Sequence, residues 1–85
     1  MAEVVVYGRP ECHLCAEALE GLEGLRREGY SFALREVDIE ADEELLRRHL
    51  ERIPVVEVDG EVASELRFDA AAVRARLDTV GAWSR

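Results

Sequence analysis

The chain has 85 residues, with 11 basic and 19 acidic side chains and a formal charge of −8 at pH 7. This length allows one compact domain and excludes two, so we expect a single domain over residues 1–85. The excess of acidic over basic side chains argues against nucleic acid as a partner, because binding to a phosphate backbone needs clustered positive charge. The longest apolar runs, such as Val4–Tyr7, are too short to cross a membrane.

The N-terminal stretch carries Glu3 where a secretory signal would have a basic segment followed by a long apolar run. We therefore expect a cytoplasmic protein, in a compartment that keeps thiols reduced. We also expect a monomer.

Two elements are predicted in the first third of the chain. The β-branched run Val4–Tyr7 predicts a strand that is buried on both faces. From Cys12 onward, apolar residues recur at helical spacing, which predicts a helix that ends near Gly29. Gly21 and Gly24 are expected to weaken this helix slightly.

The middle of the chain predicts a second strand over Phe32–Ile39. Asp42 is expected to cap a short helix with three leucines on one side, Leu45, Leu46 and Leu50. Pro54 can begin a third strand, Val55–Val58, because the first residue of a strand need not donate a hydrogen bond.

Asp59-Gly60 is a strong hairpin signal and predicts a fourth strand near Glu61–Ala63. Asp69 is expected to cap a last helix with an inward face formed by Val73, Leu77 and Val80. The predicted order is β-α-β-α-β-β-α, an α/β fold with a mixed four-stranded sheet and three flanking helices.

Both cysteines lie in the motif Cys12-His13-Leu14-Cys15, where the first strand turns into the first helix. In a cytosolic protein this spacing is typical of a dithiol redox site. The first amides of a helix lack partners and carry partial positive charge, so they stabilise a thiolate at Cys12. This stabilisation would lower the thiol pKa from ~8.5 to near ~7.

Neighbouring charges are also expected to act on the Cys12 thiol. A protonated His13 and Arg9 would lower its pKa further, and Glu11 would raise it. Cys15, on the same side of the helix, is expected to resolve mixed disulfides formed at Cys12.

Other interpretations of the cysteines remain open. They could be two unrelated buried thiols, or zinc ligands together with His49, although a zinc site needs four ligands. A metal or iron–sulfur module would need dimerisation or glutathione to complete its ligands, and a catalytically silent adaptor would use neither thiol. We predict no metal ligands within the single chain.

The sequence resembles the thioredoxin superfamily and, within it, the small bacterial glutaredoxin-like proteins. The resemblance rests on the strand Val4–Tyr7 and the segment that follows it up to Glu11, and on the Cys12–Cys15 motif. It also rests on Ile53-Pro54 and on the Asp59-Gly60 hairpin. It implies a thioredoxin-like fold of the glutaredoxin type and a thiol–disulfide oxidoreductase active in electron transport.

The resemblance also implies roles for residues outside the motif. The Ile53–Pro54 bond would be cis and pack against Cys12, with the backbone of Ile53 pairing with substrate. Arg9 would lie near a glutathione carboxylate. No bound cofactor is implied, although glutathione is a possible co-substrate; the expected partner is glutathione or a disulfide-containing protein.

The chain departs from glutaredoxins at three places. It has His13-Leu14 between the cysteines and Arg52-Ile53 before the proline. Its segment 62–67 has no diglycine, and no acid in the place that matches the acids that hold the glutathione amine. Arg52 is expected either to steer an anionic substrate or to pair with nearby carboxylates.

Five further side chains are expected to have structural or surface roles. His49 is predicted to be structural or on the surface, and Tyr7, Phe32 and Phe68 are predicted to lie in the core. Trp83 is expected to hold the last helix in place.

Overall fold

The computed structural model describes residues 2–83 and contains four strands and three α-helices in the predicted order β-α-β-α-β-β-α. The elements are β1 (Ala2–Gly8), α1 (His13–Arg27), β2 (Phe32–Asp38), a 3-10 turn (Ile39–Ala41), α2 (Glu43–His49), β3 (Val55–Val58), β4 (Glu61–Glu65) and α3 (Ala70–Thr79).

The four strands form one mixed sheet, as predicted, and lie in the order β2-β1-β3-β4. β1 runs parallel to β2 and antiparallel to β3, and the Asp59-Gly60 hairpin joins β3 to β4. Asp59 and Gly60 have φ angles of +50° and +86°. Two successive positive φ values match the tight turn that suits the twist of a hairpin, which is why this dipeptide ends the strand.

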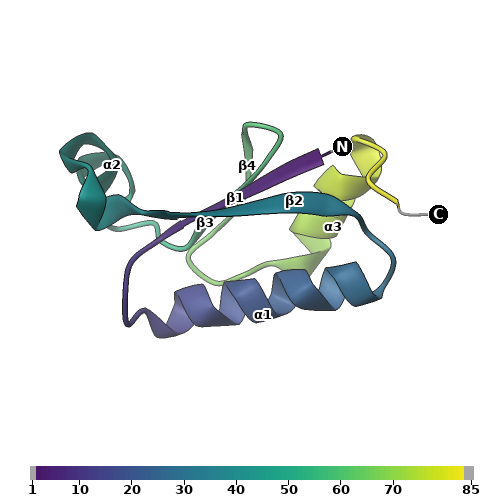
Figure 1. Cartoon of the computed structure of the whole chain (residues 1–85), viewed down its shortest axis with the longest axis horizontal. Helices are drawn as coiled ribbons and strands as arrows, with labels where there is room; N and C mark the ends of the chain where they lie inside the picture. The colour runs from purple at the N-terminus through teal and green to yellow at the C-terminus, as the bar shows by residue number, and fades with distance from the viewer. Residues whose placement is uncertain (1, 84–85) are drawn as a thin grey trace.

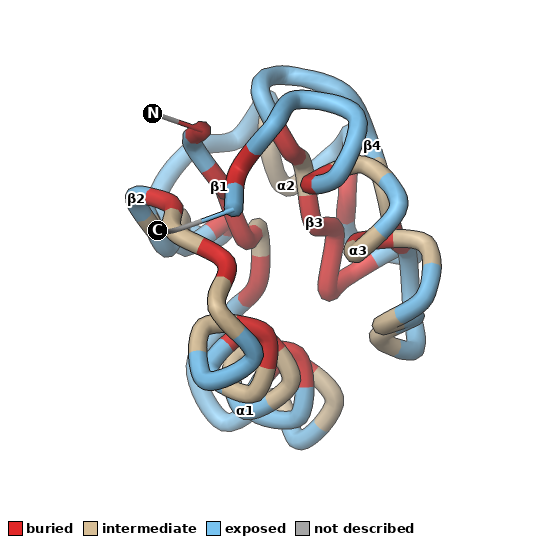
Figure 2. The backbone as a smooth tube through the Cα atoms, turned by 90° about the vertical axis from the view of Figure 1, so that its right-hand side faces the viewer, coloured by how far each residue is buried: buried red, intermediate tan, exposed pale blue. Residues whose placement is uncertain are grey.

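The main core lies between one face of the sheet and two helices, α1 and α3 (Figure 1). Strands contribute alternate residues to this face, and the helices contribute one buried stripe each. Buried positions along β1 and β3 face the stripe of α1 in Figure 2. The fully buried members include Val4, Val56, Val58, Ala18, Leu22, Val73 and Leu77.

A smaller apolar cluster lies beside the motif, at the end of the sheet where β1 and β2 finish. It combines Cys15, Ile39 and Ile53 with partly buried Cys12, Tyr7, Leu45 and Leu46. The short helix α2 lies beyond this end of the sheet, on the side away from α1 (Figure 1).

Aspartates begin both short helices, as the sequence predicts. The carboxylate of Asp42 accepts hydrogen bonds from the backbone N–H groups of Glu44 and Leu45, and that of Asp69 accepts one from the N–H of Ala72. These bonds satisfy amides that have no partner within the helix.

The structure corrects the predicted position of Val80, which is 36% exposed and does not lie on a buried face of α3. Leu50, predicted to share one side of α2 with Leu45 and Leu46, is 44% exposed. Each is the C-cap of its helix, where the chain turns away before the side chain reaches the core.

The structure also differs from the sequence expectation at the end of β2 and in the burial of Tyr7 and Phe68. β2 stops at Asp38, because the Asp38 carboxylate accepts the amide of Glu40 at 2.9 Å and begins a 3-10 turn at Ile39. Trp83 stacks on Tyr30 with ring centroids 4.1 Å apart, yet remains 52% exposed. Phe32 is buried as predicted, whereas Tyr7 and Phe68 are only partly buried.

Candidate active site

The loop between β1 and α1 places the two cysteines at the start of α1. β1 ends at Gly8, Pro10 and Glu11 form a turn, and Cys12 is the extended N-cap residue of the helix, with φ −103° and ψ 109°. A proline and a residue in the left-handed region, Glu11 with φ +59°, redirect the chain over this short distance.

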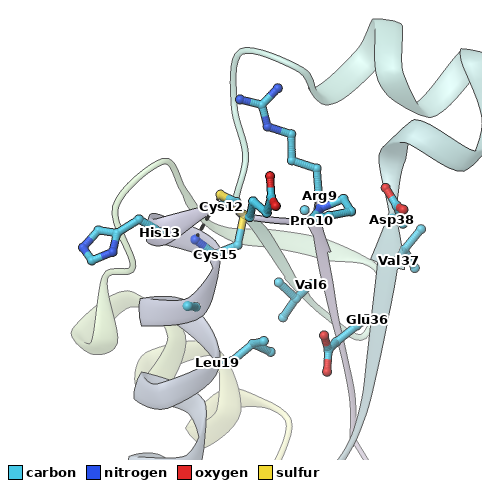
Figure 3. Close-up of a pocket in the computed structure, with 13 residues that line it drawn as sticks. Val6, Arg9, Pro10, Cys12, His13, Cys15, Leu19, Glu36, Val37 and Asp38 are labelled. Carbon is cyan, nitrogen blue, oxygen red and sulfur yellow. Dashed lines mark hydrogen bonds between the residues drawn. A yellow bond between two sulfur atoms is a disulfide. The ribbon is translucent and has the colours of Figure 1, made fainter.

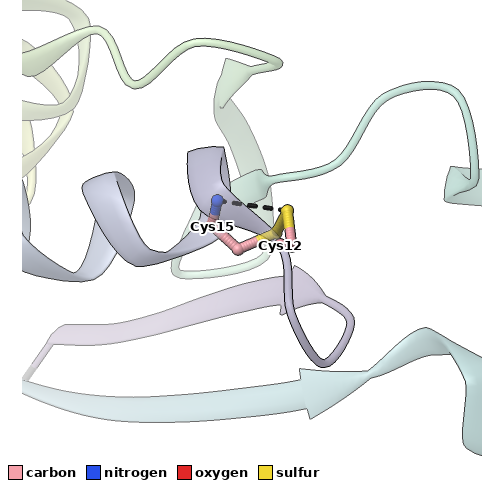
Figure 4. The surroundings of a disulfide bond; sticks show 2 residues. All are labelled: Cys12 and Cys15. Atoms are coloured by element: carbon pink, nitrogen blue, oxygen red, sulfur yellow. Dashed lines mark hydrogen bonds between the residues drawn. A yellow bond between two sulfur atoms is a disulfide. The ribbon is translucent and has the colours of Figure 1, made fainter.

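Cys12 and Cys15 form a disulfide in the structure, with their Cα atoms 5.2 Å apart (Figure 4). The backbone N–H of Cys15 donates a hydrogen bond to the Cys12 sulfur at 3.2 Å. Cys12 is half-buried and Cys15 is 7% exposed. The first sulfur is therefore the more accessible one, and the second lies beneath it.

The start of α1 places partial positive charge beside Cys12. A helix N-cap position faces the first unpaired amides and the positive end of the macrodipole. In addition, the Cys12 sulfur already accepts one of these amides. An ionised Cys12 would gain more from this arrangement than a neutral thiol, because both effects favour negative charge.

The two basic residues near the motif lie differently. The His13 ring is 86% exposed and forms an ion-pair contact with Glu17, with 2.8 Å between Nε2 and Oε2. In Figure 3 this ring points away from the two sulfurs, and the Arg9 side chain extends away from the Val6 side chain. A tuning role for either residue stays a prediction.

The turn before β3 lies against the motif. The Ile53–Pro54 peptide bond is cis, both residues are buried, and Ile53 shares the small apolar cluster with Cys12 and Cys15. The preceding Arg52 is more exposed, and its guanidinium lies 3.9 Å from the Glu65 carboxylate. Of the two alternatives for Arg52, the structure contains the pairing with a carboxylate.

A contact that the sequence did not indicate joins Tyr7 to His49. Their rings stack with centroids 4.5 Å apart, and the Tyr7 hydroxyl donates to Glu57 at 3.4 Å. His49 is only 5% exposed, and its Nδ1 has no hydrogen-bond partner among the described residues. The structure thus places His49 inside the protein rather than on its surface.

Both titratable groups of this pair are shifted. Burial lowers the pKa of His49, and the nearby positive charges of Arg48 and Arg52 lower it further. Burial also raises the pKa of Tyr7, and the Glu57 carboxylate adds to this shift. Each shift favours the neutral form, which is the form expected for a buried group.

Gly8 is a residue of the site to which the sequence analysis assigned no role. A Cβ atom at Gly8 would lie 2.9 Å from the Cys15 sulfur, closer than ordinary packing allows. Its only signal in the sequence is a glycine at the end of the strand that leads to the motif. The absence of a side chain there makes room for the buried cysteine.

A pocket of about 670 Å³ opens beside the disulfide. Both cysteines line it, together with the β1–α1 loop, the first turns of α1 and the end of β2 (Figure 3). Its floor includes Val6 and Leu19, and Glu36 and Asp38 stand at its β2 side. Sequence patterns did not assign a function to these β2 residues.

The described residues also lack two features, a group of metal ligands and a helix that could cross a membrane. Among residues 2–83, no group of three or more His, Cys, Asp or Glu side chains is arranged to hold a metal ion. In the same part of the chain, no helix is long and apolar enough to cross a membrane.

Solved structures share this fold. Protein Ne2328 from Nitrosomonas europaea is 30% identical, with a TM-score of 0.78 over 88% of this chain and 89% of that one. Protein XcR50 from X. campestris is 34% identical, with a TM-score of 0.73 over 89% of this chain and 96% of that one. A mutant thioredoxin from Halobacterium salinarum, 18% identical, has a TM-score of 0.61 over 92% of this chain and 73% of that one, which shows a shared fold.

No curated protein matches the chain. A family model does: residues 3–78 match the glutaredoxin-like domain (DUF836). This match covers all but the first residue of β1, the other three strands and all but the last residue of α3, and it includes the Cys12–Cys15 motif. The chain therefore belongs to the glutaredoxin-like family of the thioredoxin superfamily.

Proposed function

We propose that this protein is a thiol–disulfide oxidoreductase in which Cys12 attacks the substrate and Cys15 resolves the intermediate. One observation carries the proposal: Cys12 is the N-cap of α1, its sulfur accepts the amide of Cys15, and the two sulfurs are already joined in a disulfide. The same helix terminus that stabilises a thiolate before attack also stabilises it when it leaves.

The first step starts from the reduced dithiol. The Cys12 thiolate attacks one sulfur of a substrate disulfide, so that a bond forms between Cys12 and the substrate while the substrate's own S–S bond breaks. The departing substrate sulfur leaves as a thiolate and takes a proton from water. Cys12 suits this role because it is the more exposed of the two cysteines.

The second step uses the buried cysteine. The Cys15 thiol gives its proton to water, and its thiolate attacks the Cys12 sulfur, which releases the second substrate sulfur as a thiolate. Two electrons have then passed from the dithiol to the substrate, and the Cys12–Cys15 disulfide remains. A thiol reductant, with glutathione as the proposed one, would return the protein to the dithiol by two exchanges of the same kind.

Substrate recognition is proposed at the turn that precedes β3. In the described part of the chain, neither the N–H nor the C=O of Ile53 forms a backbone hydrogen bond. Ile53 also packs in the cluster that contains both cysteines. An extended substrate segment could therefore pair with this backbone while its sulfur lies at Cys12, as in strand addition. A protein disulfide and a glutathione mixed disulfide both offer such a segment.

A pair of matched variants tests the assignment of roles. Reduced protein is mixed with a peptide disulfide, and the products are identified by mass spectrometry without reductant. Cys15→Ser should accumulate a covalent adduct between Cys12 and the peptide, because nothing resolves it. Cys12→Ser should accumulate no covalent adduct with the peptide. It should also reduce the disulfide at least about a hundredfold more slowly than the wild type does.

Two results would overturn the proposal. One is equal disulfide reduction by the wild type and the Cys12→Ser variant. The other is an adduct that forms mainly on Cys15 in the wild-type protein. Circular dichroism of each variant shows whether the fold is retained, so that a loss of activity can be assigned to the missing sulfur.

A further inference from the structure

The pocket beside the disulfide is separate from the Ile53–Pro54 turn. β1 lies between β2 and β3 in the sheet; the pocket is lined by the end of β2, whereas the turn precedes β3. Neither Ile53 nor Pro54 is among the described residues that line the pocket. A substrate held at the turn would therefore have a second place to make contacts, on the other side of the reactive sulfur.

The pocket is hollow because the pattern of β2 changes near its end. Phe32 and Leu34 face α1 and pack in the main core. Glu36 and Asp38 follow on the same face, because side chains alternate along a strand. Two carboxylates thus stand where apolar side chains would otherwise cover Val6 and Leu19. In Figure 3, Glu36 and Leu19 extend toward each other across this space.

The charged groups around the pocket are mostly acidic. Among residues 2–83, neither Glu11 nor Glu36 has an ion-pair partner, and the carboxylate of Asp38 accepts the amide of Glu40. The two basic lining residues, Arg9 and His13, point away from the apolar floor in Figure 3. The pocket therefore combines an apolar floor with an acidic wall.

We propose that this pocket binds a basic side chain, arginine or lysine, close to the reactive cysteine of a protein substrate; the inference rests on the proposed function. The aliphatic part of such a side chain would cover Val6 and Leu19, and its charged end would reach the Glu36 carboxylate. A volume of about 670 Å³ is ample for one long side chain. The net charge of −8 would also attract a cationic partner from solution.

The test uses three short peptides that differ only in the residues that flank one cysteine: arginine, glutamine or glutamate. Each cysteine carries an uncharged 2-thiopyridyl group, whose release is followed by absorbance during reaction with the reduced protein. Each rate constant is divided by that of the same peptide with 2-mercaptoethanol, which removes the intrinsic reactivity of the peptide. We expect the arginine peptide to react about fivefold faster than the glutamate peptide at low salt, with the ratio approaching one at high salt.

Variants locate the source of this preference. Glu36→Arg should abolish or invert the ratio, and Glu36→Gln should move it toward one, which keeps the test usable should the arginine variant fail to fold. The control is Glu3→Arg, which makes the same change in charge. Glu3 lies on β1 next to Val4, so it faces the opposite side of the sheet from the core and the pocket. This control should keep the wild-type ratio.

Each outcome decides between the two proposals. A wild-type protein that reduces all three peptides at equal normalised rates leaves the proposed function standing and overturns the pocket assignment. If the preference for arginine survives in both Glu36 variants, or if Glu3→Arg removes it as fully as the Glu36 variants do, the preference comes from overall charge. Either result also overturns the pocket assignment. A reduced protein that reacts with none of the three peptides overturns both.

Discussion

Gly8 and Cys15 are in such close contact that the strand end has no room for a side chain beside the buried sulfur. A Cβ atom at Gly8 would lie 2.9 Å from Cys15 Sγ and 3.3 Å from Cys15 Cβ. The end of β1 and the first turn of α1 thus fit together only with a glycine at this position. The contact links the geometry of the sheet directly to that of the motif.

The Gly8→Ala substitution should therefore damage both stability and chemistry. We expect the free energy of unfolding to fall by about 1–3 kcal/mol, the usual cost of inserting atoms into a packed site. We also expect slower closure of the Cys12–Cys15 disulfide, because Cys15 must move. Chemical denaturation measures the first effect, and the rate of release of a trapped peptide disulfide measures the second. Unchanged values for both would contradict the contact.

Gly21 and Gly24 offer a matched comparison within α1. An alanine Cβ at Gly21 would overlap the ring of Phe68, whereas at Gly24 the nearest atom is an arginine nitrogen 3.8 Å away. Gly24→Ala should stabilise the protein by about 0.4–1 kcal/mol, because alanine favours the helix and restricts the unfolded chain. Gly21→Ala should destabilise it, since the overlap with Phe68 outweighs this gain. Denaturation midpoints check both, and equal stabilisation by the two substitutions would be inconsistent with the Phe68 contact.

Glu11 places a negative charge directly before the reactive cysteine. Removing that charge with Glu11→Gln should lower the pKa of the Cys12 thiol by a few tenths of a unit, since an exposed charge acts weakly through water. The control is Glu20→Gln, an exposed position on α1 outside the pocket, which should shift the pKa less. The pH dependence of Cys12 alkylation gives both values. A larger shift in the control would show that distance from Cys12 does not govern the effect.

His49 should make the protein less stable in mild acid. Burial lowers the pKa of His49 in the folded protein, while the unfolded chain has the ordinary value of about 6.5. Below about pH 6.5 the unfolded chain therefore takes up a proton more readily than the folded protein does, and the free energy of unfolding falls as the pH falls. The loss from this group is at most about 1.4 kcal/mol per pH unit.

His49→Phe tests this pH dependence, because phenylalanine keeps a ring against Tyr7 and cannot take up a proton. The difference in unfolding free energy between wild type and variant should be constant above about pH 7 and should shift in favour of the variant as the pH falls toward 5. Urea denaturation at a series of pH values measures this difference. A difference that does not change with pH would show that His49 has the same pKa in both states.

The sequence carries enough information to predict the elements and the motif, because these depend on local chemistry. Asp42, Asp69 and the Asp59-Gly60 turn act on amides a few residues away, and the structure confirms all three. The place of Cys12 at a helix start follows from the same kind of local pattern. The prediction of Val80 on an inward face is wrong, because helical periodicity does not show where the last turn ends.

The remaining features of the site depend on segments that are far apart in the chain. The stacking of Tyr7 on His49 requires the end of β1 to meet the end of α2. In the same way, Gly21 reads as a weak point of a helix until Phe68 is placed against it. The pocket brings together Glu36 of β2 and Leu19 of α1, which lie far apart in the chain. Single-sequence patterns do not encode such pairings.

The most direct test of the account is the pKa of the Cys12 thiol in the reduced protein. Alkylation by iodoacetamide is followed from pH 4 to 10, and mass spectrometry of the digested protein assigns the modified cysteine. We predict that Cys12 reacts as a thiolate with a pKa well below the ordinary thiol value of about 8.5, because the start of α1 stabilises its negative charge. A value at or above about 8.5 would contradict the proposal that this helix terminus activates Cys12.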